Sequence, residues 1–387
     1  MRMNKLGTPA SQRILQTLID HGYEAYYVGG AVRDFVRGTA SADIDIATSA
    51  TPQEVQKLFP RTVDVGIEFG TILVIIDGTP FEVTTFRNDA FSGRPTLKED
   101  LRRRDFTMNA LAYTIDGTLI DYFEGEHDIH AQKIRAVDDP HARMMEDPLR
   151  ILRACRFMAT FQYEIEAGTL KAMQKEANRL QQVAPERMKQ EMDRLLMGSH
   201  AKEALHLIVT SAIGNALPLF PKKLPMLAYM TPFTSSHEGW AYLCLAGDIH
   251  ATVLAKAYVL SNEEKSFIQV VEHAFQRRTE DVFTIKDIYQ FEADVLFIAE
   301  KLYKAYKGER TTCTVQYWQH QKQALPIQSK QELVVNGKDL LQWTNNQQGR
   351  WVGEWMTKIE QAVLHGECPN DEQVIKEWFI REFNIER

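Results

Sequence analysis

Two aspartates one residue apart, Asp43 and Asp45, follow a pair of adjacent glycines, Gly29 and Gly30. Strand side chains repeat every second residue, so both carboxylates are predicted to project from one face of a strand and to share divalent cations. The backbone N–H groups of a glycine turn that opens a helix suit a chain of phosphates. A metal and a triphosphate brought together in this way indicate nucleotidyl or phosphoryl transfer.

The predicted metal is Mg²⁺, which prefers carboxylates together with phosphate oxygens. Two ions about 4 Å apart would activate an attacking hydroxyl and stabilise a leaving pyrophosphate. The alternation of Asp43 and Asp45 with Ile44 and Ile46 favours this interpretation over two solvated loop carboxylates. Glu82 is either a third carboxylate of the site or an exposed strand residue.

Arginines follow both the glycine pair and the aspartate pair in the sequence. Arg33 lies in the first turns of the helix after the glycines, where we expect a phosphate or ribose contact rather than a surface ion pair. Three consecutive arginines, 102–104, precede Asp105. A helix can turn at most one or two of them inward, so we expect Arg104 and Asp105 at the ribose and phosphates, with Asn109 one turn further on. The net charge of -7 argues weakly against a nucleic-acid partner, but this local clustering predicts a basic track.

A further polar group recurs every three residues and predicts one stripe on a helix: Asp147, Arg150, Arg153 and Arg156. The alternative is an ion-paired surface stripe. A carboxylate only accepts hydrogen bonds and a guanidinium only donates them. Cytosine and adenine each offer an amine donor beside a ring-nitrogen acceptor, whereas uracil and guanine offer the reverse. Asp147 and Arg150 at a base edge would therefore accept C and A and reject U and G.

A chain of 387 residues is too long for a single hydrophobic core, so we expect several modules. Its 25% of charged residues are typical of a globular protein. No apolar run approaches membrane-spanning length, which predicts a cytoplasmic protein without a membrane partner. The cysteines show no zinc-binding spacing and are expected to be reduced thiols: Cys155, Cys244, Cys313 and Cys368.

The elements that must position these residues predict an α+β fold. The first 137 residues read as a small mixed or antiparallel sheet with helices, and helices follow from about residue 138. The expected elements are a helix over 10–22, a strand over 26–28, a helix from Thr51-Pro52 to Phe59, a hairpin of 72–76 and 81–86 with a three-residue connection, a helix over 99–112 and a strand ending at Asp121. His127-Asp128, a dyad also found in metal phosphohydrolases, is expected at the surface.

Several of these motifs together resemble one family, the bacterial class II tRNA nucleotidyltransferases, or CCA-adding enzymes. The resemblance covers essentially the whole chain. It rests on the glycine turn with Arg33-Asp34, the Asp43/Asp45 pair, Arg103-Arg104-Asp105, residues 146–156, Glu186-Arg187 through Glu191, and residues 332–339.

The resemblance implies a nucleotidyltransferase head at 1–137, a neck carrying the base-selecting residues at 138–198, a body at 199–270 and a tail that binds tRNA at 271–387. It implies CTP and ATP as nucleotides, Mg²⁺ as cofactor, and a tRNA bound through its 3′ end and acceptor/T arm. Glu186-Arg187 would brace the neck. The implied ligand contacts are Asp43 and Asp45 for the metal and Gly30, Arg33, Arg104, Asp147, Arg150, Arg153 and Arg156 for the nucleotide.

Three departures from the family pattern bear on the product. Phe69-Gly70-Thr71 replaces the usual His-Gly-Thr, and residues 121–125 lose a proline and a glycine of the usual Asp-Pro-Phe-Gly-Gly hinge. The segment 88–98 is roughly ten residues shorter than in full CCA-adding enzymes, where long loops tend to be functional. In the family this loop helps the pocket change from CTP to ATP, so its shortness predicts CC addition, with the terminal A left to a second enzyme.

Three alternatives stay open from the sequence. One is complete CCA addition despite the short loop. Another is a poly(A) polymerase, against which the acidic ending over 377–382 speaks. The last is a catalytically inactive tRNA-binding protein, against which the retention of Asp43, Asp45, Asp147 and Arg150 speaks.

Overall fold

The computed structural model of the protein describes residues 6–40, 43–66, 70–87, 95–344 and 346–385. The chain divides into two compact units, Met1–Lys222 and Lys223–Arg387. The predicted boundaries after residues 137, 198 and 270 remain predictions within this coarser division. No helix among the described residues is long and apolar enough to cross a membrane.

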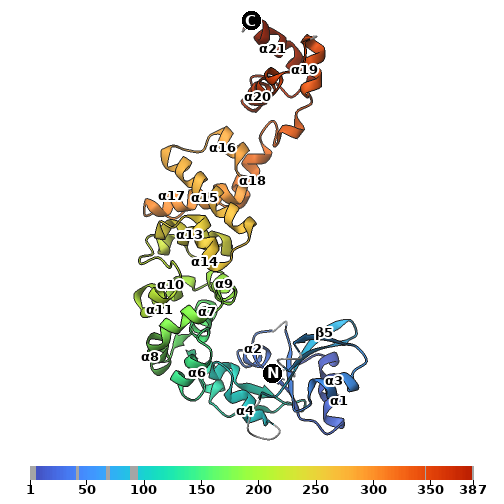
Figure 1. The fold of residues 1–387 in the computed structure, drawn as a ribbon, viewed down its shortest axis with the longest axis vertical. Helices are drawn as coiled ribbons and strands as arrows, with labels where there is room; N and C mark the ends of the chain where they lie inside the picture. The colour runs from blue at the N-terminus through green and yellow to red at the C-terminus, as the bar shows by residue number, and fades with distance from the viewer. Residues whose placement is uncertain (1–5, 41–42, 67–69, 88–94, 345, 386–387) are drawn as a thin grey trace. The chain divides into compact units, whose positions relative to one another are not determined.

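The first unit contains a mixed seven-stranded sheet with the order β3-β4-β5-β2-β1-β6-β7 (Figure 1). Strand β1 pairs antiparallel with β2 and β6, whereas β2 and β5 pair parallel. The predicted α+β class with a mixed sheet is confirmed. The strands are β1 (Ala25–Val28), β2 (Asp45–Thr48), β3 (Thr62–Gly66), β4 (Thr71–Ile76), β5 (Thr79–Thr85), β6 (Leu111–Tyr113) and β7 (Leu119–Asp121).

The hairpin between β4 and β5 is tighter than predicted. Thr79 already pairs with Ile76, so only Asp77 and Gly78 form the connection, and the predicted three-residue connection is wrong. Both residues have positive φ, 51° and 81°. This conformation is typical of the two-residue turn whose twist matches that of the flanking strands.

The helices of the head begin where the sequence offers caps. Thr8 and Thr51 each accept a hydrogen bond from the backbone N–H three residues on, and a proline follows each of them. Helix α1 buries its apolar face, including Ile14 and Leu18. The head helices are α1 (Pro9–Asp20), α2 (Gly30–Val36), α3 (Pro52–Leu58), α4 (Leu97–Arg102), the short 3₁₀ helix η2 (Thr107–Asn109) and α5 (Gly125–His130).

The helix predicted over 99–112 is therefore wrong beyond Arg102. Asp105 explains part of the break, because its Oδ1 accepts a hydrogen bond from the N–H of Phe106 at 2.8 Å. Such a bond competes with the helical backbone pattern. The chain then passes through η2 into strand β6, which lies next to β1 in the sheet.

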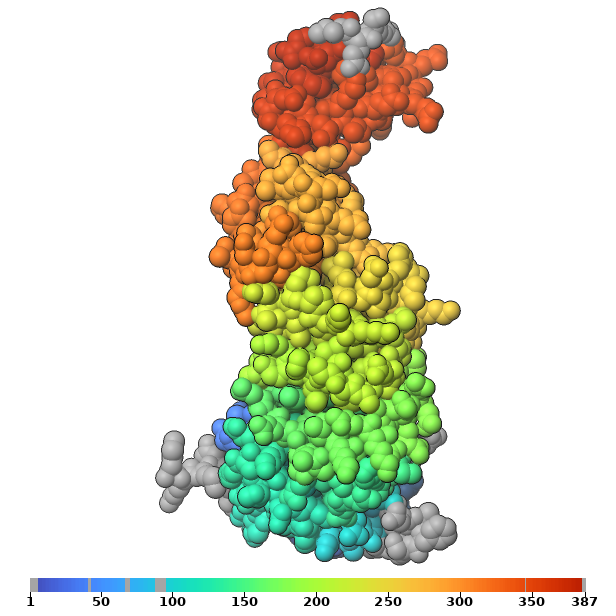
Figure 2. All heavy atoms as spheres, turned by 90° about the vertical axis from the view of Figure 1, so that its left-hand side faces the viewer, coloured from blue at the N-terminus to red at the C-terminus, as the bar shows by residue number. Residues whose placement is uncertain are grey.

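Helices continue from the head to the end of the first unit, and Figure 2 shows the teal and green neck residues packed directly on the cyan residues of the head. The predicted helical neck is confirmed apart from β9, which pairs in parallel with β8. The elements are β8 (Lys133–Ile134), α6 (Pro140–Glu146), α7 (Arg150–Phe161), β9 (Glu164–Ile165), α8 (Ala167–Glu176), η3 (Ala177–Gln182), α9 (Pro185–Leu196), α10 (Ala201–Thr210) and α11 (Ala212–Ala216).

The second unit is helical throughout its described residues. A buried ion pair joins Lys301 Nζ to Glu238 Oε1 at 2.6 Å, and an aromatic cluster around Trp355 and Phe379 fills its last part. Its helices are α12 (Leu227–Met230), α13 (Ser236–Gly247), α14 (Ala251–Tyr258), α15 (Asn262–Glu280), α16 (Ile285–Gln290), α17 (Ala293–Tyr306), α18 (Val315–Gln323), η4 (Lys330–Glu332), α19 (Gly337–Thr344), α20 (Arg350–Leu364) and α21 (Glu372–Ile385).

Candidate active site

The glycine turn brings the backbone of α2 close to the carboxylates. Gly29 has φ +69° and caps α2; a Cβ placed on it would lie 3.0 Å from Asp45 Oδ2 and 3.2 Å from Arg104 Nη1. The positive φ favours glycine, and an added Cβ would push both side chains by a few tenths of an ångström. Gly30 begins the helix, and its nearest side chain is that of Arg33.

The two aspartates do not share a strand as predicted. Asp45 is the first residue of β2, and Asp43 lies before that strand. Strand β2 can begin only where its neighbours offer partners, and Asp45 pairs with Val28 of β1 and with Glu82 of β5. The register thus places Glu82 beside Asp45.

These carboxylates accumulate negative charge. Burial raises the pKa of Asp45, Arg104 opposes the shift and Asp43 reinforces it. Burial also raises the pKa of Glu82, and the charge of Asp45 adds to that rise. A cation would relieve this concentration of negative charge, and oxygen donors suit a hard divalent ion. Within the described residues, no three acidic, histidine or cysteine side chains are already arranged as a metal site.

Asp105 is the buried centre of the basic side of the site. Its carboxylate accepts hydrogen bonds from Arg153 Nε and Nη2 at 2.8 and 2.6 Å and from Asn109 Nδ2 at 2.9 Å. Burial alone would raise its pKa, but Arg153 and these hydrogen bonds outweigh it and hold the pKa below the usual range. Asp105 therefore positions Arg153, and its contact with the ribose stays a prediction.

Arg33 joins this network from α2. Its Nη1 donates to Asn109 Oδ1 at 2.8 Å, and its Nε and Nη2 bind Asp34 at 3.0 and 3.1 Å. The guanidinium also lies 4.7 Å from the ring centre of Phe161. Arg104, at the end of the arginine run, donates to Asp100 Oδ2 at 3.1 Å. Fixed cations of this kind can receive phosphate oxygens without first being ordered.

The stripe of residues 147–156 differs from the prediction at its start. Asp147 is extended, with φ -142° and ψ 98°, and precedes α7 instead of lying on it. Its Oδ2 accepts from Arg187 Nη2 at 2.8 Å. Arg150 donates to Glu146 and to the carbonyl oxygens of Arg143 and Arg103 at 2.9–3.0 Å. Asp147 and Arg150 are thus close in the fold but bonded to other partners.

Arg153 and Arg156 follow on the side of α7 that faces the cavity, and both are partly buried. Both bind Glu191 of α9, Arg153 Nη1 at 3.4 Å and Arg156 Nε at 2.5 Å. Glu191 is buried, and these two guanidinium groups compensate its negative charge. Arg156 additionally stacks 3.9 Å from the ring centre of Phe157.

One cavity of about 460 Å³ collects these groups. Such a volume is within the usual range of small-molecule sites. Asp43 is not among its lining residues. They are Gly29, Gly30, Arg33, Asp45, Arg87, Arg103, Arg104, Asp105, Asn109, Asp147, Arg150, Arg153, Arg156, Phe157, Arg187 and Arg194.

Comparison with known proteins decides the family. Family models match three segments: "Poly A polymerase head domain" at 25–135, "Probable RNA and SrmB-binding site of polymerase A" at 162–222 and "tRNA nucleotidyltransferase domain 2" at 231–379. The CCA-adding enzyme of Bacillus cytotoxicus is 38% identical over 388 residues, covering 96% of this chain and 98% of the relative. This chain belongs to the CCA-adding enzyme family.

Solved structures agree with this assignment. The crystal structure of the Bacillus stearothermophilus CCA-adding enzyme in complex with CTP has a TM-score of 0.88 and 35% identity, covering 98% of this chain and 99% of that one. A Thermotoga maritima CCA-adding enzyme complexed with tRNA shares the fold, with a TM-score of 0.71 at 22% identity. The resemblance stated from the motifs is confirmed.

Five pocket residues were not predicted to contact a ligand: Arg87, Arg103, Phe157, Arg187 and Arg194. Arg87 follows strand β5, and Arg187 and Arg194 lie on α9. The spacing of seven residues puts Arg187 and Arg194 on one face of that helix, which could have flagged them. Arg187 was expected to brace the neck, and its pairing with the carboxylate of Asp147 joins α9 to the residues before α7.

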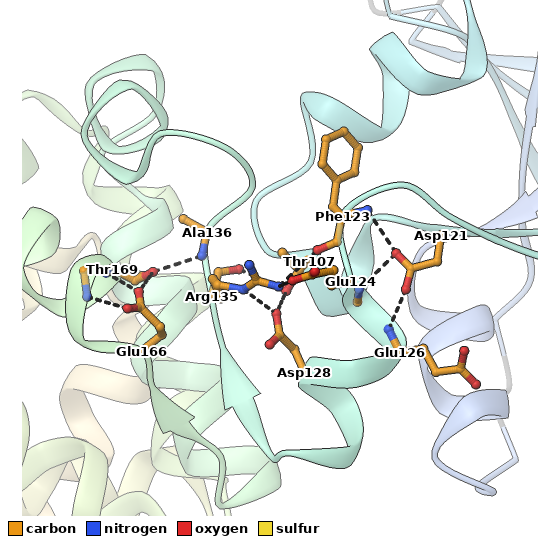
Figure 3. A network of polar contacts seen from close by, with 12 residues as sticks. Thr107, Asp121, Phe123, Glu124, Glu126, Asp128, Arg135, Ala136, Glu166 and Thr169 are labelled. Atoms are coloured by element: carbon orange, nitrogen blue, oxygen red, sulfur yellow. Dashed lines mark hydrogen bonds and ion pairs between the residues drawn. The ribbon is translucent and has the colours of Figure 1, made fainter.

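The surface position expected for the dyad His127-Asp128 is confirmed for His127, which is exposed, and wrong for Asp128. Asp128 is buried, and its Oδ2 accepts from Thr107 Oγ1 at 2.5 Å and from Arg135 Nε at 2.7 Å (Figure 3). A Cβ on Gly125 would overlap the carbonyl oxygen of Thr107, so glycine lets α5 approach η2. In this CCA-adding enzyme family member, Asp128 holds the segment that carries Asn109.

Proposed function

We propose that the chain extends the 3′ end of tRNA by CCA, using CTP and ATP and releasing pyrophosphate. The observation that carries this proposal is a single cavity in which Asp45, the glycine turn, a ring of arginines and the Asp147 carboxylate face one space. Family membership supports the same activity, because relatives matched over nearly their whole length are named CCA-adding enzymes.

The chemistry requires positioning and charge stabilisation more than covalent catalysis. The tRNA 3′-hydroxyl would attack the α-phosphate of the nucleotide. Mg²⁺, when bound by Asp43 and Asp45 with Glu82 beside them, would supply positive charge to the hydroxyl and the phosphates. Arg33 and Arg104 would hold the phosphates near the glycine turn, since their guanidinium groups are already fixed by Asn109, Asp34 and Asp100.

Base choice would depend on Asp147 and Arg150. The base amine would have to compete with Arg187 for Oδ2 of Asp147, because that atom accepts from Arg187 without a nucleotide. A base that lacks this amine would leave the carboxylate with its internal partner. Arg153 and Arg156, held by Glu191, would line the same space without choosing the base.

Of the two possible products, the predicted CC addition has less support than complete CCA addition. It rested on the segment 88–98, of which residues 88–94 lie outside the described residues, as does Phe69. The relatives at 36–38% identity carry the name CCA-adding enzyme and align over 95–96% of this chain. We therefore propose complete CCA addition, with CC addition as the alternative. The helical tail would bind the tRNA.

Primer extension tests the proposal. A tRNA transcript that lacks CCA would be incubated with Mg²⁺ and CTP, ATP or both, and the products sequenced. CTP alone should give CC, and both nucleotides should give CCA. Arrest after CC with abundant ATP would assign CC addition, long A tails would assign a poly(A) polymerase, and no extension would refute the function. Asp45→Ala should abolish extension while tRNA binding persists.

A further inference from the structure

Arg194 is a pocket arginine with no counter-ion among the described residues. It lies on α9, is exposed, and lines the cavity together with Arg156 and Phe157. Its neighbours in the cavity differ: Arg156 binds Glu191, Arg187 binds Asp147 and Arg104 binds Asp100. A cation at a cavity wall without an internal partner retains its full capacity for an anionic ligand.

The position of Arg194 along the pocket follows from two adjacent helices that run in the same direction. Asp147 lies beside Arg187, and Arg156 beside Glu191. Arg194 is seven residues beyond Arg187, about 10 Å along the helix axis at 1.5 Å per residue. It is therefore two turns away from the carboxylate that would read the base.

Helix α2 also lines the cavity, through Gly30 and Arg33. Arg33, near the start of α2, stacks on Phe157 and Phe161, whose ring centres lie 5.5 and 4.7 Å from its guanidinium. The glycine turn is at the beginning of that same helix. Arg194 thus faces the part of the cavity where phosphates, and not a base edge, would lie.

From this placement we propose that Arg194 binds a phosphate oxygen of a substrate. The inference rests on the proposed function, in which two phosphate-bearing substrates share the cavity. The phosphate belongs either to the triphosphate of the nucleotide or to a phosphodiester at the tRNA 3′ end. Both present the same anionic oxygens to a guanidinium fork.

The test compares Arg194→Ala and Arg194→Lys with the unmodified protein and with Arg179→Ala. Arg179 is a neck arginine outside the cavity, paired with Glu176. The CTP KM, the tRNA KM, kcat and the salt dependence of tRNA binding would be measured for each. Arg194→Ala should raise one KM by about tenfold, the change expected for one charge-assisted hydrogen bond. Lysine should recover part of it.

The two sources give different results. A raised CTP KM with an unchanged salt dependence assigns the triphosphate. A raised tRNA KM, with the slope of log affinity against log salt reduced by about 0.7, assigns one contact to single-stranded RNA. The inference is overturned if both KM values stay within about twofold of those of Arg179→Ala, or if Arg194→Ala lowers only kcat and the melting temperature. Extension by the unmodified protein in the same reactions keeps this result separate from a failure of the proposed function.

Discussion

Replacing Gly29 by alanine should damage catalysis more than it damages the fold. The backbone at Gly29, with φ 69° and ψ -137°, is one that residues with a Cβ rarely adopt, and holding it there costs about 1–3 kcal/mol. The new methyl group would also lie 3.0 Å from Asp45 Oδ2 and 3.2 Å from Arg104 Nη1. Both side chains must give way, and they are a proposed metal ligand and a proposed phosphate contact.

Activity should therefore fall by more than stability alone explains. A misplacement of about 1 Å at a reacting centre costs about 10²-fold in rate, so the shift of a few tenths of an ångström needed here should cost several-fold. Gly38→Ala is the matched control, because Gly38 also has positive φ (+75°), lies just beyond the same helix, and has no atom within 4 Å of the added Cβ. The Gly38→Ala variant should lose stability, but its folded molecules should keep the normal rate of nucleotide extension.

Urea unfolding and single-nucleotide extension with CTP would measure the two effects separately. The expected result is a comparable loss of stability in both variants and a several-fold loss of rate in Gly29→Ala alone. The reasoning about Asp45 and Arg104 fails if Gly29→Ala keeps a rate close to that of Gly38→Ala once the folded fraction is taken into account.

Two further predictions concern the carboxylates of the basic side. Asp147→Ala should admit UTP and GTP, because loss of the acceptor removes about 1–3 kcal/mol of discrimination; competition among the four triphosphates measures this, and unchanged selectivity would contradict the base-reading role. Asp105 has a pKa below its unfolded value near 3.9, so it contributes stability above that pH and loses it as the pH falls through the folded pKa. Asp105→Asn should be less stable at pH 7 by about 3 kcal/mol and should show a shallower loss between pH 5 and 3; equal slopes in acid unfolding would refute it.

Local signals predicted much of the fold. The pair Thr51-Pro52 marked the start of α3, and the continuous apolar run of residues 72–76 marked β4. One error was avoidable: Asp147 precedes Pro148, and a residue before proline disfavours the helical conformation. The recurrence of polar residues at every third position favoured a helix that already included Asp147.

Other features needed contacts that no local pattern contains. The ion pair of Asp105 with Arg153 joins residues 48 apart in the chain, and Asp147 with Arg187 joins residues 40 apart. Helix propensity alone extends the helix of 99–112 past Asp105, whereas the folded chain turns that carboxylate toward α7. The residue types of the site were predictable, but not which carboxylate serves the ligand and which serves the scaffold.

The pairing of Asp105 with Arg153 has a consequence for synthesis of the chain. The ribosome releases the head first, with its sheet, its glycine turn and the aspartates proposed to bind metal, while Arg153 follows only with α7. Until then Asp105 has no guanidinium partner, and a buried carboxylate without one is costly. A nascent chain ending near residue 137 should therefore leave the segment around Asp105 open to solvent, and the nucleotide pocket should close only when α7 and α9 have emerged.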